Sequence, residues 1–408
     1  MKILQLCKKF PFPLKDGESI AVNYLSKSLV ELGCEVTLLT MNTSKHYFQF
    51  DHIPEELNHY NAIYHVDVNN DVTVKGALLN LASGDSYHVS RYRDHAYAQK
   101  LIELLETEDF DVIHLETLYV TPFISTIRKH SSALIVLRSH NVEFEIWQRV
   151  ADNTRFFLKK WYLNLLNRRL KKYEVQQLSK IDVLLAITQR DLKTFRSLGY
   201  LQSAKIIPIG LDTRDYLAMD KDVFSSPSIS FIGSLDWIPN VEGLEWFLDD
   251  IWPRLLTKHP TLTFHVAGRN MPEYFRKMHR QNVTFHGEVE DAKSFINSFP
   301  VMVVPLLSGS GMRVKILEGM FLGRLVITTS LGLEGIDAKD RNQILVAETV
   351  DEFINKIDFC FDHPLLIQHI CHRAQVFAAK HYDNLEIGKE LFSYYKLKLD
   401  KVEVNKTD

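Results

Sequence analysis

The sequence predicts an α/β protein with two domains, each built on a doubly wound parallel sheet. Apolar runs of strand length alternate with helical patterns along most of the chain, which is typical of parallel sheets covered by helices. The chain has 408 residues, enough for two domains that each bury a core. We interpret residues 209–227, which end in SSP, as the linker. The expected domains are therefore residues 1–208 and 209–383.

The composition is that of an ordinary globular protein. Hydrophobic residues make up 46% of the chain and charged residues 24%, and the net charge of −3 gives no basic field to attract nucleic acid. Four scattered cysteines without metal-ligand spacing indicate reduced core thiols in a cytoplasmic protein. The sequence holds no run of about 18 apolar residues, so we expect no membrane-spanning segment.

Apolar runs in the first domain are expected to form the strands of its sheet. They occupy residues 2–7, 35–40, 62–66, 72–74, 111–115, 133–137 and 183–187. A helical pattern from Ser19 onward links the first two runs, which makes the opening a β-loop-α-β unit. Because ligands bind at the carboxyl ends of strands in such sheets, polar residues that follow a strand are site candidates.

Three residues of the first domain are candidates on this ground. Gly17 lies in the loop after the first strand, where a glycine either lets backbone approach a substrate or simply makes a turn. Glu116 follows a buried run and either faces the cleft or caps the helix that begins near Pro122. His140, within SHNVE, either donates a hydrogen bond to a substrate hydroxyl or caps the next helix.

The second domain repeats the strand and helix alternation. Its expected strands are residues 229–232, 262–267, 283–286, 301–307 and 326–329, followed by helices at 351–380 and 384–398.

The strongest candidate site is the stretch 308–334, SGSGMRVKILEGMFLGRLVITTSLGLE. Gly309 and Gly311 follow a buried run, and Arg313 and Lys315 precede or open a helix. Backbone N–H groups and the helix dipole at such a turn favour an anion, and two cations add full charges. The stretch therefore predicts a phosphate site, with a tight connection carrying solvated cations as the alternative.

The Gly-x-Gly-x-Arg-x-Lys-x-Leu-Glu segment in this stretch resembles the nucleotide-sugar site of the group 1 (family 4) glycosyltransferases. The resemblance extends over nearly the whole chain and includes SHNVE, IIPIGLD and GSLDW. It implies the GT-B architecture, in which two Rossmann-like domains face each other across a cleft and a final helix, here 384–400, crosses back to the first domain. It also implies a retaining enzyme that moves a sugar from a nucleotide sugar to an acceptor hydroxyl.

The resemblance assigns roles to residues of the second domain. Glu318 matches the family's second glutamate, which binds the ribose hydroxyls of the donor. Ser310 stands where the first glutamate contacts the transferred sugar, and Met312 belongs to the same donor-binding segment. The turn with Gly287 and Val289 matches one that presents backbone groups to the nucleotide base.

In the first domain, His140 matches a histidine that contacts the donor sugar, and Gly17 lies in a loop that contacts acceptor or donor. Together with Glu116, Gly17 is expected on the acceptor side.

The chain departs from the family at Gly233 and Ser234, which follow the first strand of the second domain at another anion-ready turn. Well-known members carry an arginine at the Ser234 level and a lysine shortly after it, and these cations hold the donor diphosphate. Arg313 and Lys315 are the candidate replacements, so we expect them, with His140, to carry the catalysis.

Residues 155–172, RFFLKKWYLNLLNRRLKK, contain seven cations and no acid, interleaved with aromatic and aliphatic side chains. Such a helix is typical of a membrane-surface element. The alternative is a core-facing helix with a solvated basic side. A membrane contact would place the protein at the inner face of the membrane.

Three functions are compatible with these observations. The first is a metal-independent glycosyltransferase of surface polysaccharide or glycoconjugate biosynthesis, with a nucleotide sugar as co-substrate, no other cofactor, and a glycan or lipid-linked acceptor. The sequence has no Asp-x-Asp metal motif at the end of an expected strand, so we expect that the reaction needs no metal. The alternatives are a nucleotide-sugar epimerase or hydrolase of the same architecture and a non-catalytic sugar-nucleotide-binding scaffold.

Overall fold

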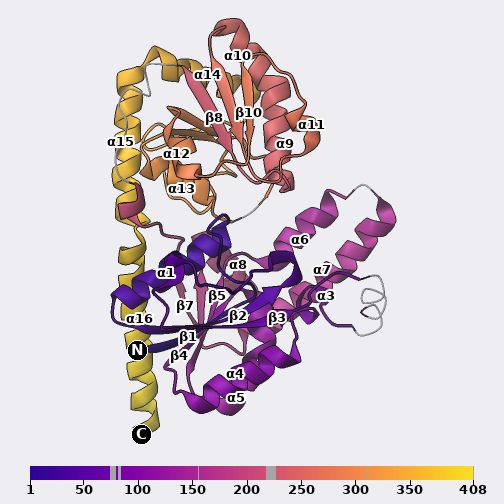
Figure 1. Ribbon diagram of the computed structural model, residues 1–408, viewed down its shortest axis with the longest axis vertical. Helices are drawn as coiled ribbons and strands as arrows, with labels where there is room; N and C mark the ends of the chain where they lie inside the picture. The colour runs from indigo at the N-terminus through magenta and orange to yellow at the C-terminus, as the bar shows by residue number, and fades with distance from the viewer. Residues whose placement is uncertain (74–79, 81–83, 155, 217–226, 310, 408) are drawn as a thin grey trace. The chain divides into compact units, whose positions relative to one another are not determined.

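The computed structural model describes residues 1–407 except 74–79, 81–83, 155, 217–226 and 310. The chain divides into two units (Figure 1). The first unit comprises Met1–Gly210 and Asn384–Asp408, and the second unit comprises Leu211–Asp383. The boundary that the sequence suggested, between residues 208 and 209, differs by two residues from this division.

The first unit is built on a seven-stranded sheet in the order β3-β2-β1-β4-β5-β6-β7, in which all neighbours are parallel. The strands are β1 (Lys2–Cys7), β2 (Glu35–Thr43), β3 (Ala62–Val68), β4 (Val112–Glu116), β5 (Leu134–Ser139), β6 (Val183–Ala186) and β7 (Ser203–Ile206). The strand order reverses direction between β1 and β4. In doubly wound sheets this switch point is where a crevice for ligands opens.

Helices cover both faces of this sheet because its strands are apolar on both sides. Ile135 and Leu137 of β5 pack with one set of helices, whereas Leu134 and Val136 pack with the other. The first set contains α4 (His95–Thr107), α5 (Ile124–His130) and α7 (Phe157–Leu178), and the second contains α1 (Gly17–Glu31) and α16 (Asn384–Thr407). The remaining helices are α3 (Tyr87–Ser90), α6 (Glu143–Asp152) and α8 (Gln189–Ser197).

The C-terminal helix α16 belongs to the first unit although it follows the second in sequence (Figure 1). It packs against α1, where Ser28 Oγ donates to the carbonyl of Asn384 at 2.9 Å. A side chain at Gly388 would lie 2.6 Å from the Ser28 Cβ, so glycine permits the close approach. Tyr395 reaches the sheet and forms a 3.0 Å hydrogen bond with His114 of β4.

The second unit is built on a six-stranded parallel sheet in the order β10-β9-β8-β11-β12-β13. Its strands are β8 (Ser228–Ile232), β9 (Thr263–Ala267), β10 (Val283–Gly287), β11 (Val301–Val304), β12 (Leu325–Thr328) and β13 (Leu345–Val346). The switch point lies between β8 and β11. Ser234, just after β8, and the segment after β11 therefore lie at the same crevice.

The helices of the second unit include α9, which leads through a π-helical turn at Phe247–Ile251 into α10. They are α9 (Ile238–Trp246), α10 (Trp252–Lys258), α11 (Glu273–Arg276), α12 (Ala292–Asn297), α13 (Val314–Phe321), α14 (Val350–Asp362) and α15 (Pro364–His381).

The predicted α/β class with two parallel sheets is confirmed, with corrections in detail. The strand expected at 72–74 is wrong for residues 72 and 73, and residue 74 lies outside the described residues. The short strand β13 was missed because two residues leave no periodic signal. The helix expected over 351–380 is two helices, since His363 and Pro364 end α14 and begin α15. The four cysteines are free and buried, as expected.

Candidate functional site

In the first unit, two predicted residues meet at the carboxyl edge of the sheet. Glu116 ends β4 and His140 follows β5, and Glu116 Oε2 lies 2.7 Å from His140 Nε2. The other oxygen, Oε1, accepts from Gln5 Nε2 of β1 at 2.8 Å. The alternative that Glu116 caps a helix is therefore wrong, because its two oxygens are bound by Gln5 of β1 and by His140, just after β5.

The Glu116 carboxylate is fully buried, and its neighbours keep it ionised. Burial alone would raise its pKa, but nearby positive groups outweigh burial and hold the pKa well below the usual range. Burial also lowers the pKa of His114 to about 4, so His114 is neutral near pH 7. The stabilising charge therefore comes from Arg138, 3.7 Å away, together with the hydrogen bond from His140.

An ionised Glu116 orients His140. Because a carboxylate only accepts hydrogen bonds, the imidazole must present Nε2–H to it. Among the described residues, none is hydrogen-bonded to the other ring nitrogen, Nδ1. The imidazole is thus held with one nitrogen left for a substrate group.

The same edge carries charged residues that the sequence reasoning missed. Lys8, just after β1, lies 3.0 Å from a Glu18 oxygen and 4.5 Å from the Tyr119 ring centroid. The Tyr119 hydroxyl donates to Glu143 at 2.8 Å. Although burial opposes it, Glu18 and Glu143 raise the pKa of Lys8 above its usual range. In sequence these residues resemble ordinary charged loop residues. Only their positions after strands indicate that they share the carboxyl edge of the sheet.

Gly17 is the first residue of α1, in the turn after β1. Asp16 caps that helix by accepting from the Ser19 N–H, and it also binds Lys9 at 2.7 Å. Just after β4, Thr117 adopts φ 80° and ψ 162°, a strained backbone for a residue with a branched side chain. Strain of this kind is concentrated at functional sites, which supports this edge as one.

In the second unit, the predicted phosphate turn leads into α13. Gly309 and Gly311 have φ values of 112° and 82°, which a residue with a side chain adopts only at a cost. A Cβ at Gly309 would lie 2.6 Å from Arg313 Nη2, so the guanidinium packs directly against this glycine. Met312, which precedes Arg313 in sequence, is buried. Ser310 lies outside the described residues.

Lys315 points back to the end of β8. Its Nζ donates to the carbonyl of Ile232 at 3.0 Å and to Asn240 Oδ1 at 2.9 Å. A side chain at Gly233 would lie 3.0 Å from this ammonium group. Burial and the charge of Arg313 lower the pKa of Lys315 to about 7. Lys315 is therefore tied to the turn at Gly233 and is not the permanent full charge that the sequence suggested.

A third cation lies at the Ser234 turn. Arg269, after β9, donates from Nε to Ser234 Oγ at 3.0 Å. The loops after β8 and β9 touch, since a Cβ at Gly268 would lie 1.9 Å from the carbonyl oxygen of Gly233. The structure places the Arg269 guanidinium against the Ser234 side chain, at the turn that follows β8.

Glu318 lies in α13, five residues after the N-cap Arg313, a distance of about 7.5 Å along the axis from the rise per residue of a helix. Its Oε1 accepts from the Tyr216 hydroxyl at 3.3 Å. Burial raises the pKa of Glu318, whereas the Tyr216 hydrogen bond and the Lys293 charge oppose that shift. Lys293 Nζ lies 4.6 Å from the Tyr216 ring centroid. Tyr216, which follows Leu211 closely in sequence, was missed because it lies in the predicted linker.

Gly287 ends β10 with φ 71°, and its carbonyl accepts from Gly268 N–H at 2.7 Å. Val289 is half-buried two residues later. Both therefore lie at the carboxyl edge of the second sheet, next to the loop that carries Arg269.

The affinity for a nucleoside diphosphate is expected to fall as the pH rises above 7. In the free protein the lowered pKa leaves Lys315 mostly neutral above pH 7, and a bound diphosphate would raise that pKa and require proton uptake. The Kd should then increase by up to about tenfold per pH unit. Titration calorimetry between pH 6 and 9 measures this slope. A flat Kd in the wild type, or an unchanged slope in Lys315→Gln, would contradict the expectation.

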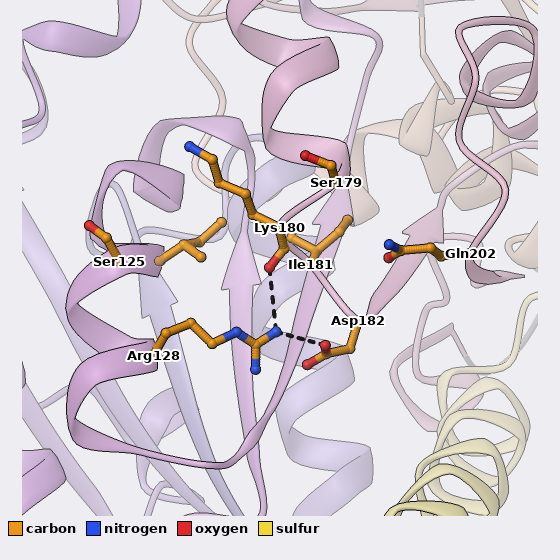
Figure 2. Close-up of a pocket in the computed structure, with 8 residues that line it drawn as sticks. Ser125, Arg128, Ser179, Lys180, Ile181, Asp182 and Gln202 are labelled. Atoms are coloured by element: carbon orange, nitrogen blue, oxygen red, sulfur yellow. Dashed lines mark hydrogen bonds and ion pairs between the residues drawn. The ribbon is translucent and has the colours of Figure 1, made fainter.

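A pocket of about 390 Å³ lies at the opposite edge of the first sheet (Figure 2). There Arg128 donates to Asp182 at 2.7 Å and to the Lys180 carbonyl at 3.4 Å. Asp182 also accepts from the Ile135 N–H at 2.7 Å. Because Asp182 precedes β6, the pocket lies at the amino ends of the strands, away from the ligand edge of such sheets. We interpret this ion pair as structural.

Two family models match the chain. The model described as Glycosyltransferase Family 4 matches residues 16–215, and the model described as Glycosyl transferases group 1 matches residues 226–363. Among curated proteins, an uncharacterized 44.6 kDa protein in the cps region of Klebsiella pneumoniae is 21% identical over 306 residues, which cover 72% of this chain and 76% of that protein.

Solved structures of similar fold cover nearly the whole chain. Sucrose-phosphate synthase from Thermosynechococcus elongatus has a TM-score of 0.71 at 14% identity, over 98% of this chain and 100% of that one. Alr3699/HepE from Anabaena in complex with UDP has a TM-score of 0.64 at 14% identity, over 97% and 100% of the two chains. HepE has also been solved with UDP-glucose, with a TM-score of 0.62 at 16% identity, over 97% and 99% of the chains.

Proposed function

Since the chain belongs to the group 1, family 4-like glycosyltransferases, we propose that it transfers a sugar from a nucleotide sugar to an acceptor hydroxyl with retention of configuration. The observation that carries the proposal is the set of groups at the start of α13. Arg313, Arg269 and Lys315 gather at two Gly-containing turns, and Glu318 lies further along the same helix.

We place the nucleotide in the second unit. The diphosphate would lie at the turn Gly309–Gly311 and the turn Gly233–Ser234, where a Cβ at Gly309 or Gly233 would press on a cation. The ribose hydroxyls would reach Glu318, whose carboxylate accepts from a vicinal diol. Gly287 and Val289 would border the base. HepE, a protein of similar fold, has been solved with UDP and with UDP-glucose, which supports a nucleotide sugar as ligand.

The bond to the diphosphate leaving group breaks as negative charge develops on its oxygen. Arg313 and the backbone N–H groups at the start of α13 would stabilise that charge, and Arg269 and Lys315 would add to it. His140, oriented by Glu116, would hold a substrate hydroxyl through its second ring nitrogen. The acceptor would bind near Gly17 and Glu116. The leaving group would help to deprotonate the acceptor hydroxyl, which attacks on the same face of the sugar ring.

A panel of nucleotide sugars tests this function and separates it from the alternatives. A glycosyltransferase releases nucleoside diphosphate faster when an extract of membrane-bound glycans from the producing organism is added, and the product keeps the anomeric configuration by NMR. Release of nucleoside diphosphate without acceptor would indicate a hydrolase. A change in the sugar without that release would indicate an epimerase, and binding without turnover would indicate a scaffold. We expect the first result, undiminished by EDTA.

Because the Klebsiella relative lies in a cps region, we propose surface polysaccharide biosynthesis as the process. The free, buried cysteines suit the reducing cytoplasm. None of the described helices is long and apolar enough to cross a membrane.

We further propose that the start of α7 contacts the membrane surface. Phe157 and Trp161 are 71% and 63% exposed, and Phe156 and Leu158 are exposed beside them. Leu166 and Leu170, further along the helix, are buried, so the core-facing alternative holds only for the second half of α7. Arg155 lies outside the described residues. Exposed aromatic rings with lysines beside them insert at the interface of anionic membranes.

Phe157→Ser/Trp161→Ser is therefore expected to weaken binding to vesicles with 30% anionic lipid by at least tenfold in sedimentation. The control is Tyr47→Ser, which removes an aromatic ring that is 64% exposed at another place in the first unit. Equal vesicle binding by all three proteins would contradict a membrane contact at α7.

A further inference from the structure

A cationic pocket in the first unit has no part in the steps above. Its volume is about 520 Å³, and it lies between α6, α7 and α8. Arg149 of α6, Arg168 and Lys171 of α7 and Arg190 of α8 line it, with Glu145 as the one acidic side chain among its lining residues. Three helices thus bring four cations to one cavity.

The pocket lies toward the carboxyl edge of the sheet. Glu145 is in the first turn of α6, which follows β5 and His140. Arg190 is in the first turn of α8, which follows β6 and is capped by Thr188. A ligand in the pocket would therefore approach the edge that holds the Glu116–His140 pair.

The cations outnumber the acids that can neutralise them. Glu145 forms an ion pair with Arg190 and lies 4.0 Å from Arg149, and Asp191 lies 3.1 Å from Arg190. In the described part of the chain, no acidic side chain forms an ion pair with Arg168 or Lys171. Lys171 Nζ instead lies 4.8 Å from the Phe144 ring centroid, and both cations are exposed. The cavity therefore keeps a net positive charge.

The geometry points to an acceptor subsite that binds a phosphate or diphosphate group. Planar guanidinium groups bind phosphate oxygens in pairs, and a lysine adds a point charge. On α7, Arg168 lies seven residues after the exposed Trp161, which puts it on the same face about 10 Å further along the helix. A lipid anchored at Trp161 would present its headgroup phosphate to Arg168. The inference rests on the proposed function, because it names the acceptor class of that reaction.

Titration calorimetry with the full chain tests the subsite, with UDP at saturation so that the nucleotide site is filled. The probes are geranyl diphosphate and inorganic pyrophosphate. Arg168→Gln/Lys171→Gln removes two exposed cations of the pocket. Lys45→Gln/Lys129→Gln removes two exposed lysines outside it and serves as the charge-matched control.

We expect the pocket variant to bind geranyl diphosphate at least tenfold more weakly than wild type, and the control to bind within twofold. Tighter binding of geranyl diphosphate than of pyrophosphate identifies a lipid-borne phosphate, and equal binding identifies the phosphate group alone. Equal affinity of the pocket variant and the control, or no binding of either probe, would overturn the subsite. If UDP itself does not bind, the donor function fails, while loss of diphosphate binding in the pocket variant still supports the subsite.

Discussion

Replacing His140 by alanine is expected to lower kcat/KM by about 10²- to 10³-fold and to leave nucleoside diphosphate affinity unchanged. The imidazole is fixed at 2.7 Å from the buried Glu116 carboxylate, so its other nitrogen is preorganised for the substrate hydroxyl that we propose it binds. The proposed diphosphate and ribose contacts all lie in the second unit, so the substitution should not disturb them. Steady-state kinetics and calorimetric titration of the same preparation measure both quantities.

His52→Ala is the matched control, because His52 is an exposed histidine of the first unit away from the strand ends. It should keep wild-type kinetics. If His140→Ala loses nucleotide binding in parallel with activity, His140 has a structural role and the assignment is wrong.

Arg313→Gln is expected to lower kcat by about 10²- to 10³-fold, the effect of removing one donor that stabilises a developing oxyanion. The guanidinium packs against Gly309 at the first turn of α13, where the diphosphate is proposed to bind. Arg269→Gln should cost less, because Arg269 is held at the edge of the turn by its hydrogen bond to Ser234, which in turn donates to Asp236. The readout is single-turnover release of nucleoside diphosphate.

An exposed arginine of the second unit gives the control. Arg276→Gln, in the last turn of α11, should leave kcat unchanged. Equal rates for Arg313→Gln and Arg276→Gln would remove Arg313 from the mechanism.

Much of the fold could be predicted because parallel strands buried on both faces leave continuous apolar runs. The run at residues 2–7 matches β1 to the residue, and most other runs differ by one to three residues at an end. The two-domain GT-B fold class is confirmed by the two sheets and by the solved structures of similar fold. Strand β13 was not predicted, because its two residues are positioned by pairing with β12 and carry no periodic pattern of their own.

The candidate site was predictable only where a residue follows its strand directly. Glu116 and His140 were found this way, but their 2.7 Å contact depends on the neighbouring order of β4 and β5, which periodicity does not reveal. Lys315 was misjudged because burial and the charge of Arg313 lower its pKa, and because its position depends on Asn240, 75 residues away in sequence. The positions of Tyr216 and Arg269 likewise depend on tertiary contacts with Glu318 and Ser234.

The most direct test of the account is a thermal-shift panel of nucleoside diphosphates and nucleotide sugars on wild type and on Arg313→Ala/Glu318→Ala. A ligand that binds the folded state raises the midpoint by mass action. We predict that nucleotides of one base raise the wild-type Tm by several degrees and that the double variant, folded with a similar Tm alone, loses this shift. No shift with any nucleotide, or an equal shift in both proteins, would contradict a nucleotide site at the start of α13.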